Sequence, residues 1–232
     1  LQPVYACYGK ETHLMQSFVD KIIDKVALPE HRDFAVTRFD LNETPIDAVL
    51  EDVETLPFMV PKKLVIAKNA LFLTGKDKSK VEHHLDHLLE YISEPVDYSV
   101  LMLLIPEDKL DERKKIVKKL KAQNQLVSFL PMKPGELEEW VKSLAKQKGS
   151  AISDEAVTTL LLYTGPHLQT IDAEIEKCSI YAGGGMISRE MVEQLVSRST
   201  EQTVFMLIDE MVAMRIDKAL AILHDLLKQR AE

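Results

Sequence analysis

Short apolar runs alternate with amphipathic stretches along the first 130 residues, and this alternation limits the possible folds more than any other feature. The apolar runs are rich in strand-forming residues, and the stretches between them have apolar residues at helical spacing. The predicted strands are 4–8, 34–39, 64–67, 100–105 and 126–129, and the predicted helices are 14–26, 42–54, 81–92 and 113–121. Such alternation indicates an α/β fold, in which helices flank both faces of a five-stranded parallel sheet.

The pattern changes after Leu130, because every stretch from Pro134 onward has helical periodicity and no further strand is predicted. We therefore expect all-α structure in this part. Helices are predicted at 136–148, 153–163 and 166–181, in a short stretch after Ser188, and in a helical pair from Gln202.

Three domains follow from this change of pattern. We expect an α/β domain at 1–132, a small helical lid-type domain at 133–200 and the first helices of a third, helical domain at 201–232. Two residues are expected to mark helix starts: Thr44 as an N-cap followed by Pro45 in the first turn, and Pro166 in the first turn of its helix. Because Glu232 follows a helical stretch without a capping residue, we expect the chain to be cut from a longer protein.

Composition excludes several classes of protein. The 232 residues are 46% hydrophobic, which is enough for a globular core, and no apolar run reaches the roughly 18 residues of a membrane span. The first residues lack the layout of a signal peptide, so a cytoplasmic location is expected. Cys7 and Cys178 fit reduced, buried thiols. A net charge of -8 argues against nucleic-acid binding over the whole surface, although one basic face stays possible.

An apolar corner stands between a predicted helix and a predicted strand, in the segment TLPFMVPKKLVIAK at 55–68. Pro57 and Pro61 end the helix there. Two interpretations of Leu56, Phe58 and Met59 are open. They could fold back as a lid on the local core, or they could form a hydrophobic plug that is offered to a partner protein.

The first predicted strand ends in YGKETHLMQ, where a nucleotide-binding protein would carry its phosphate loop. This segment has one glycine, and Glu11 places a negative charge where phosphate would bind. The third strand ends in Lys68 and Asn69 and not in an acidic pair that would hold Mg²⁺. The domain therefore has the outline of a P-loop ATPase without its catalytic parts, and we predict no catalytic residue and no cofactor.

Two further groups of polar residues are predicted to carry no chemistry. His83, His84 and His87 include a pair at helical spacing, but no other ligand completes a metal site nearby, so we predict no bound metal. Three carboxylates, Asp172, Glu174 and Glu176, spread around a helix and do not converge as an acid/base pair would.

Taken together, these segments resemble one family over essentially the whole chain: the delta subunit of bacterial DNA polymerase III, a clamp-loader component. The resemblance is carried by YACYGKETHLMQ, TLPFMVPKKLVIAKNA, FLPMKPGELEEWV and TGPHLQTIDAEIEKCSIYAGG. It implies a subunit with an AAA+ type of fold that binds no ATP itself. Such a subunit sits in a pentameric loader beside the ATP-binding tau/gamma subunits and delta prime. It belongs to an assembly with DNA-directed DNA polymerase activity, which is a nucleotidyltransferase activity.

The resemblance also implies a partner for the corner. In the family, hydrophobic residues at this corner enter a pocket of the beta sliding clamp and promote its opening for loading on primed DNA. Matched by position, they are Leu56, Pro57, Phe58 and Met59. The resemblance thereby favours the plug over the lid.

The resemblance bears on assembly and DNA contact as well. The family's third domain is a helical collar that assembles the loader, and only its first helices are present here, so clamp contact is expected of this chain and loader assembly is in doubt. Arg113, Lys114 and Lys118 are the candidates to face DNA.

Two other functions compete with this interpretation. The first is a divergent P-loop ATPase that uses Lys10 and Thr12. The second is an autonomous DNA-binding module in which the basic stretch 113–121 follows the phosphates.

Overall fold

The structure, a computed structural model, describes residues 1–76, 80–197 and 200–229. The chain divides into two compact units, Leu1–Pro131 and Met132–Glu232. None of the helices in the described ranges has the length and apolar content needed to cross a membrane. The further division predicted at residues 200 and 201 stays a prediction.

The first unit contains a five-stranded parallel sheet, as predicted. Its strands are β1 (Val4–Tyr8), β2 (Val36–Asp40), β3 (Lys63–Lys68), β4 (Ser99–Ile105) and β5 (Leu126–Ser128). They lie in the order β2-β3-β4-β1-β5, and every neighbouring pair is parallel. The central strands β1, β3 and β4 are apolar on both faces because both faces are covered.

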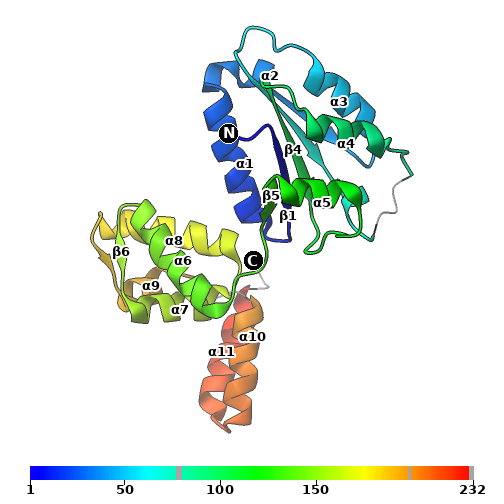
Figure 1. Ribbon diagram of the computed structural model, residues 1–232. Helices are drawn as coiled ribbons and strands as arrows, with labels where there is room; N and C mark the ends of the chain where they lie inside the picture. The colour runs from blue at the N-terminus through cyan, green and yellow to red at the C-terminus, as the bar shows by residue number, and fades with distance from the viewer. Residues whose placement is uncertain (77–79, 198–199, 230–232) are drawn as a thin grey trace. The chain divides into compact units, whose positions relative to one another are not determined.

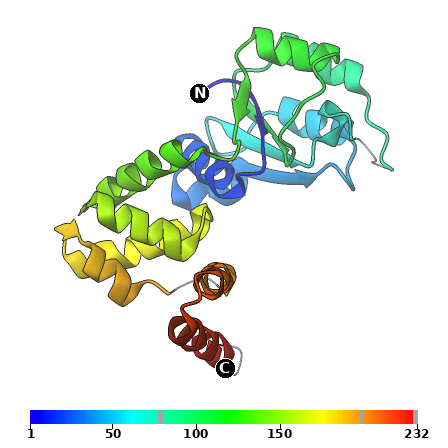
Figure 2. The same ribbon diagram turned by 90° about the horizontal axis from the view of Figure 1, so that it is seen from below.

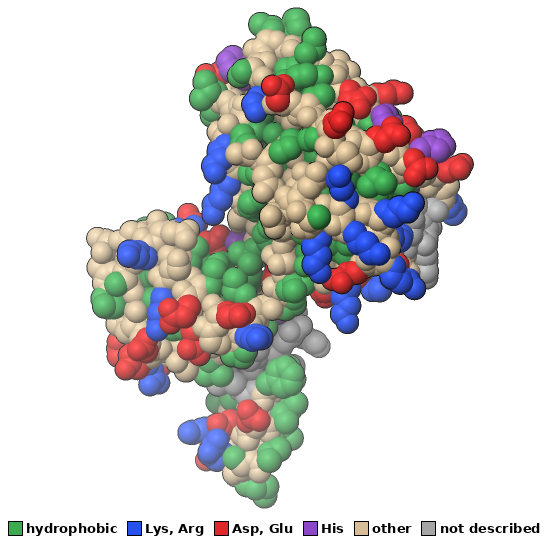
Figure 3. All heavy atoms as spheres, in the orientation of Figure 1, with side chains coloured by type: hydrophobic (Ala, Val, Ile, Leu, Met, Phe, Trp, Pro, Cys, Tyr) green, Lys and Arg blue, Asp and Glu red, His purple; other side chains and the backbone are tan. Residues whose placement is uncertain are grey.

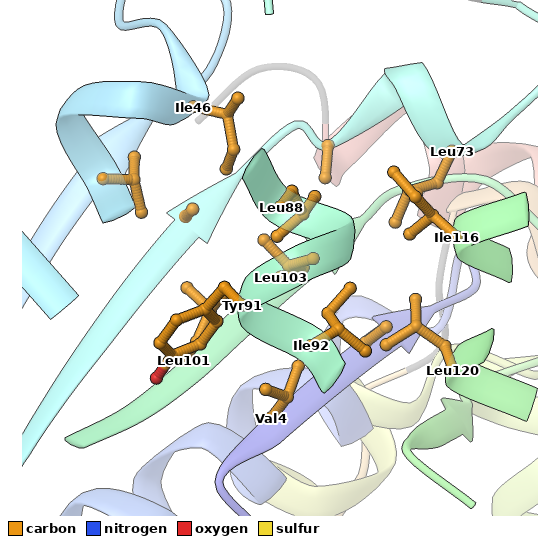
Figure 4. Close-up of a cluster of buried hydrophobic side chains, with 14 of the residues drawn as sticks. Val4, Ile46, Leu73, Leu88, Tyr91, Ile92, Leu101, Leu103, Ile116 and Leu120 are labelled. Carbon is orange, nitrogen blue, oxygen red and sulfur yellow. The ribbon is translucent and has the colours of Figure 1, made fainter. Parts of the chain in front are cut away.

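Helices cover the two faces of this sheet (Figure 1). They are α1 (Thr12–Val26), the one-turn η1 (Pro29–His31), α2 (Arg32–Ala35), α3 (Ile46–Glu54), η2 (Leu71–Leu73), α4 (Leu85–Ser93) and α5 (Lys115–Ala122). Because successive strand residues point to opposite faces, Val4 packs with α3, α4 and α5, whereas Tyr5 packs with α1. Figure 4 shows the first of these two cores, in which Tyr91 and Ile92 of α4 lie against Leu101 and Leu103 of β4.

Predicted boundaries were wrong at several places in this unit. Phe34 and Ala35 belong to the short α2 and not to the second strand. α4 begins at Leu85 and not near residue 81, since the segment before it is extended along α3. Thr44 is not the N-cap of α3; Pro45 occupies that position in an extended conformation. In each case a tertiary contact or a backbone constraint outweighed local periodicity.

The second unit is mainly helical, with α6 (Pro134–Gln147), α7 (Asp154–Thr164), α8 (Leu168–Ala182), α9 (Arg189–Leu195), α10 (Thr200–Val212) and α11 (Ile216–Gln229). Ser153 and Ser188 cap α7 and α9 through their hydroxyl oxygens. α10 and α11 form a helical pair, seen nearly end-on in Figure 2.

The sequence-based prediction needed two corrections here. Two-residue strands, β6 (Ala151–Ile152) and β7 (Met186–Ile187), pair in parallel, although no strand was predicted after Leu130. Strands this short leave no readable periodicity. Pro166 lies before His167, the N-cap of α8, and therefore does not open the helix itself. The fold class as a whole, α/β followed by helices, is confirmed.

Candidate functional site

The corner predicted from the sequence lies between α3 and β3. α3 ends at Glu54, and the next residue, Thr55, is extended. The N–H of Thr55 still donates to the carbonyl oxygens of Glu51 and Asp52, at 3.2 and 3.1 Å. The helix cannot continue beyond this point, because Pro57 disfavours a helical conformation of Leu56 and has no N–H of its own to donate. The corner precedes β3, so it lies at the amino edge of the parallel sheet.

Three large apolar side chains of the corner point away from the core. Leu56, Phe58 and Met59 are 72%, 72% and 73% exposed, which are the highest values among the large hydrophobic residues described in the first unit. Pro57 is half-buried and Val60 is buried. The lid interpretation is therefore wrong. We refer to Leu56–Met59 as the corner plug.

The backbone of the corner plug has one unusual residue. Met59 has a φ of 59°, in the left-handed region that non-glycine residues rarely occupy. The neighbouring Val60 is buried in the same core as α1 and Leu64, so packing fixes the chain immediately after Met59. Strained backbone of this kind persists where the surrounding structure imposes it, and it is common at binding sites.

The backbone amides of the loop after β1, where a phosphate loop would stand, donate hydrogen bonds to neighbouring segments of the protein. This loop lies at the carboxyl edge of the sheet, opposite to the corner plug. The N–H groups of Gly9, Lys10 and Glu11 donate to Ile105 O, Asp108 Oδ1 and Phe129 O, at 3.1, 3.0 and 3.1 Å. These amides are the groups that would have to wrap a phosphate. In this loop their donor capacity is already used by the protein.

Gly9 is required by the close approach of this loop to β5. Its φ is 136°, and a Cβ placed on it would lie 1.9 Å from the carbonyl oxygen of Phe129. The glycine that could suggest a phosphate loop therefore serves a packing role, since it lets two backbone segments touch.

A cavity of about 450 Å³ opens beside this loop, and most of its charged groups pair with one another. Lys76 pairs with Glu107 at 2.8 Å, Arg113 with Asp111 at 2.9 Å, and Lys10 lies 3.8 Å from Asp108. The hydrogen bond from Arg113 lowers the pKa of Asp111 to about 2. The pKa of Glu107 is likewise lowered, first by its hydrogen bond with Lys76. Lys109 also lines the cavity, and it has no ion pair with the residues that the structure describes.

The predicted basic residues differ in how far they are available. Arg113 and Lys114 precede α5, and their charged groups are engaged by Asp111 and by the carbonyl of Phe72. Lys118 is exposed on α5, with no ion-pair partner within the described ranges. Lys and Arg side chains gather over α5 and the segment before it, with acidic groups among them (Figure 3).

Two residues of the histidine cluster form hydrogen bonds with the N-terminal turn of α3. His83 Nδ1 accepts the N–H of Ile46, the first residue of α3, at 3.1 Å. His84 Nδ1 lies 3.0 Å from Asp47 in the first turn of the same helix. The structure contains no group of three potential metal ligands within the residues that it describes. The orphan donor of a helix N-terminus explains His83 without a metal.

The remaining candidates have structural partners. On α8, Asp172 and Glu176 pair with Lys148 at 3.1 and 2.8 Å, while Glu174 pairs with Lys177 at 2.5 Å.

Two thiols, Cys7 and Cys178, are free and buried, and burial raises the pKa of Cys7 to about 12. A thiol with so high a pKa is a poor nucleophile at neutral pH.

Sequence reasoning missed the side chains that hold α3 beneath the corner plug. Lys63 of β3 and Tyr98, just before β4, donate to carbonyl oxygens of the last turn of α3. Lys63 lies in the segment TLPFMVPKKLVIAK, but only the apolar residues of that segment were given a role; Tyr98 lies outside every segment singled out from the sequence, and its hydrogen bond spans 44 positions. Only the apolar run that follows Lys63 hinted that its side chain could be buried.

Comparison with known proteins gives consistent results. A family model described as DNA polymerase III, delta subunit, matches residues 5–130. The DNA polymerase III subunit delta of Bacillus subtilis strain 168 is 42% identical over 234 residues, which cover 100% of this chain and 67% of that protein. The solved structure of the Bacillus subtilis DNA clamp loader delta protein superposes with a TM-score of 0.89 at 40% identity, covering 100% of this chain and 69% of that one.

Proposed function

The chain belongs to the DNA polymerase III delta subunit family of clamp-loader proteins, which act in DNA replication, and on this premise we propose that its corner plug binds the beta sliding clamp. Leu56, Pro57, Phe58 and Met59 enter a pocket on the clamp and help to open one interface of the ring for loading on primed DNA. The observation that carries the proposal is the exposure of 72–73% for three adjoining large apolar side chains at one corner.

The physical argument rests on the surface that the corner plug leaves in water. Isolated apolar residues on a surface are ordinary, but a group of them is typical of an interaction site. Burial of Phe58 and Met59 in a pocket would supply roughly 2 to 3 kcal/mol each. Phe58 is the expected hot spot, since an aromatic ring removes a large area from water with few torsions to freeze.

Opening of the clamp follows from differential binding. A ligand shifts a conformational equilibrium only as far as it binds one form more tightly than the other. The corner plug therefore has to bind the opened or strained clamp better than the closed ring. Binding to a clamp variant that cannot close, compared with binding to the intact ring, measures this difference directly.

A direct titration tests clamp binding. Phe58→Ala should leave the protein folded and weaken its affinity for the clamp at least tenfold. Phe205→Ala is the matched control, because Phe205 is 61% exposed but lies on α10 in the second unit. Equal affinities of the wild type and Phe58→Ala would rule out the corner plug as the clamp-binding element.

We also infer that the chain does not hydrolyse ATP by itself. Support comes from the loop after β1, whose amides are used internally and whose Glu11 would repel a phosphate. ATP turnover at background level, and no thermal stabilisation by nucleotide, are the expected results. Turnover that Lys10→Ala abolishes would instead establish the divergent ATPase.

The partners follow the same premise. As a clamp-loader subunit, the protein has the ATP-binding tau/gamma subunits and delta prime as partners, with assembly through a helical collar of which this chain holds the first helices, and it works in the cytoplasm. Contact with primed DNA occurs through the assembled loader, and Lys118 is the best placed of the predicted basic residues because Arg113 and Lys114 are engaged. Tight, strongly salt-dependent binding of DNA by the isolated chain would favour the autonomous DNA-binding module instead.

A further inference from the structure

The last turn of α3 is held by side chains from distant parts of the chain. The final carbonyl groups of a helix lack N–H donors within the helix and need donors from elsewhere. Lys63 Nζ donates to the carbonyl oxygen of Asp52 and lies 3.2 Å from its carboxylate. The hydroxyl of Tyr98 donates to the carbonyl oxygen of Glu54 at 2.7 Å. The residue that follows Glu54 begins the segment of the corner plug.

Lys63 is an unusual residue to find in this place. Its side chain is only 7% exposed, although burial of an ammonium group is costly unless the charge is paired and hydrogen-bonded. Both conditions are met at the C-terminal end of α3, where the helix dipole also favours a positive charge. Strands covered on both faces are usually apolar, so a buried charge in β3 points to a requirement beyond packing.

Lys63 and Tyr98 act as one unit. The backbone N–H of Lys63 donates to the carbonyl oxygen of Tyr98 at 3.1 Å, where β3 and β4 begin side by side. The two side-chain donors are therefore carried by adjoining backbone segments of the sheet. Any shift of the end of α3 against the sheet would have to break both hydrogen bonds together.

The other end of the corner plug is fixed as well. Val60 is buried, and Met59 turns the chain in its left-handed conformation. Only residues 56–59 lie between the held end of α3 and this buried position. A short segment fixed at both ends loses less conformational entropy when it binds than a free loop does.

We infer that Lys63 and Tyr98 are positioning residues that hold the corner plug in its binding conformation before the clamp arrives. The inference rests on the proposed clamp-binding function and deepens it. Neither side chain has to touch the clamp, because both act through the carbonyl groups of α3. They raise clamp affinity by preorganising the corner plug, so they have no effect on affinity when the corner plug does not bind.

Removal of one hydroxyl group tests the role of Tyr98. Tyr98→Phe should weaken clamp affinity about threefold to tenfold, since a larger share of molecules then holds the corner plug out of place. The matched control is Tyr181→Phe, which removes an exposed hydroxyl in the second unit and should leave the affinity unchanged. Circular dichroism at the assay temperature verifies that each variant is folded.

The charge is tested with a neighbouring pair of lysines. Lys63→Met keeps the length of the side chain but removes the donor, and it should weaken clamp affinity at least as much as Tyr98→Phe. Lys62→Met removes the same charge from the exposed neighbouring position, so it controls for long-range attraction to the clamp. If Lys63→Met does not fold, Tyr98→Phe alone decides the question.

A double-mutant cycle separates positioning from general stability. In a Phe58→Ala background, Tyr98→Phe should have a clearly smaller effect on clamp affinity, because the main anchor that it positions is gone. An equal loss in both backgrounds would overturn the inference, and so would unchanged affinity of Tyr98→Phe in the wild type. If Phe58→Ala itself has no effect, the proposed function fails, a result that differs from failure of the positioning role.

Discussion

The two edges of the parallel sheet differ in which groups they leave exposed to solvent. At the amino edge, the corner plug leaves Leu56, Phe58 and Met59 in water and places hydrogen bonds only beneath them. At the carboxyl edge, the loop after β1 turns its amides inward to Ile105, Asp108 and Phe129. The amino edge therefore leaves apolar side chains exposed to water, whereas at the carboxyl edge the amides of the loop are hydrogen-bonded within the protein.

This contrast agrees with the proposed clamp contact at the amino edge. In open α/β sheets, ligands usually bind at the carboxyl ends of the strands. Here the N–H of Lys10 donates a hydrogen bond to the carboxylate of Asp108. A bound anion would otherwise accept that hydrogen bond. The exposed apolar surface lies at the opposite edge, and an apolar surface suits a protein partner better than a nucleotide.

The largest expected effect on stability comes from Gly9. Gly9→Ala would place a methyl group 1.9 Å from the carbonyl oxygen of Phe129, at a φ of 136°. We expect a loss of at least about 3 kcal/mol in the free energy of unfolding, measured with urea. Gly75→Ala is the control, because its Cβ would meet no atom within 4 Å. Similar stabilities of the two variants would show that the loop is not tightly closed.

A smaller effect is expected from Asp108. Asp108→Ala leaves the N–H of Lys10 without its carboxylate acceptor and should cost about 1 kcal/mol of unfolding free energy, because water can partly replace this exposed hydrogen bond. Asp108→Asn retains an acceptor oxygen and should recover most of that loss. If alanine is tolerated as well as asparagine, the closure of the carboxyl edge does not depend on this hydrogen bond.

The start of α3 predicts a pH dependence. Burial raises the pKa of Asp47, but hydrogen bonds from the ring and backbone of His84 outweigh it, so the pKa is lowered overall. A lowered pKa contributes stability above the unfolded value of about 3.9, and this contribution is lost as the pH falls through the folded value. Asp47→Asn should therefore flatten the loss of stability between pH 6 and pH 3, as followed by urea unfolding.

A neighbouring carboxylate serves as the control for that measurement. Asp86→Asn changes an exposed residue in the first turn of α4 and leaves the hydrogen bonds of Asp47 in place. Its acid profile should follow that of the wild type more closely than the profile of Asp47→Asn does. The reverse order would mean that Asp47 does not stabilise the start of α3.

The smallest effect is expected at the corner plug itself. Phe58→Ala should change the free energy of unfolding by no more than about 0.5 kcal/mol, because the ring is 72% exposed. Val60→Ala, two residues later, removes buried methyl groups and should cost more than about 1 kcal/mol. A large loss for Phe58→Ala would mean that the ring belongs to the core in solution, which would restore the lid interpretation.

Sequence alone determined the architecture of the first unit. Periodicity identified the five strands, and the helices between them required a parallel sheet, because the repeat of apolar residues reports which faces are covered. It also located the corner and showed that the loop after β1 lacks the parts of a phosphate loop. These are local properties, and a window of a few residues contains them.

Tertiary structure decided what these segments do. The sequence of the corner is compatible with a lid or a plug. In the structure, Val60 is buried and the end of α3 is held by hydrogen bonds, so Leu56, Phe58 and Met59 point outward. The hydrogen bonds that hold α3 join residues 11, 37 and 44 positions apart, through Lys63, His83 and Tyr98. No periodicity records such pairings, because they exist only once the sheet has brought distant segments together.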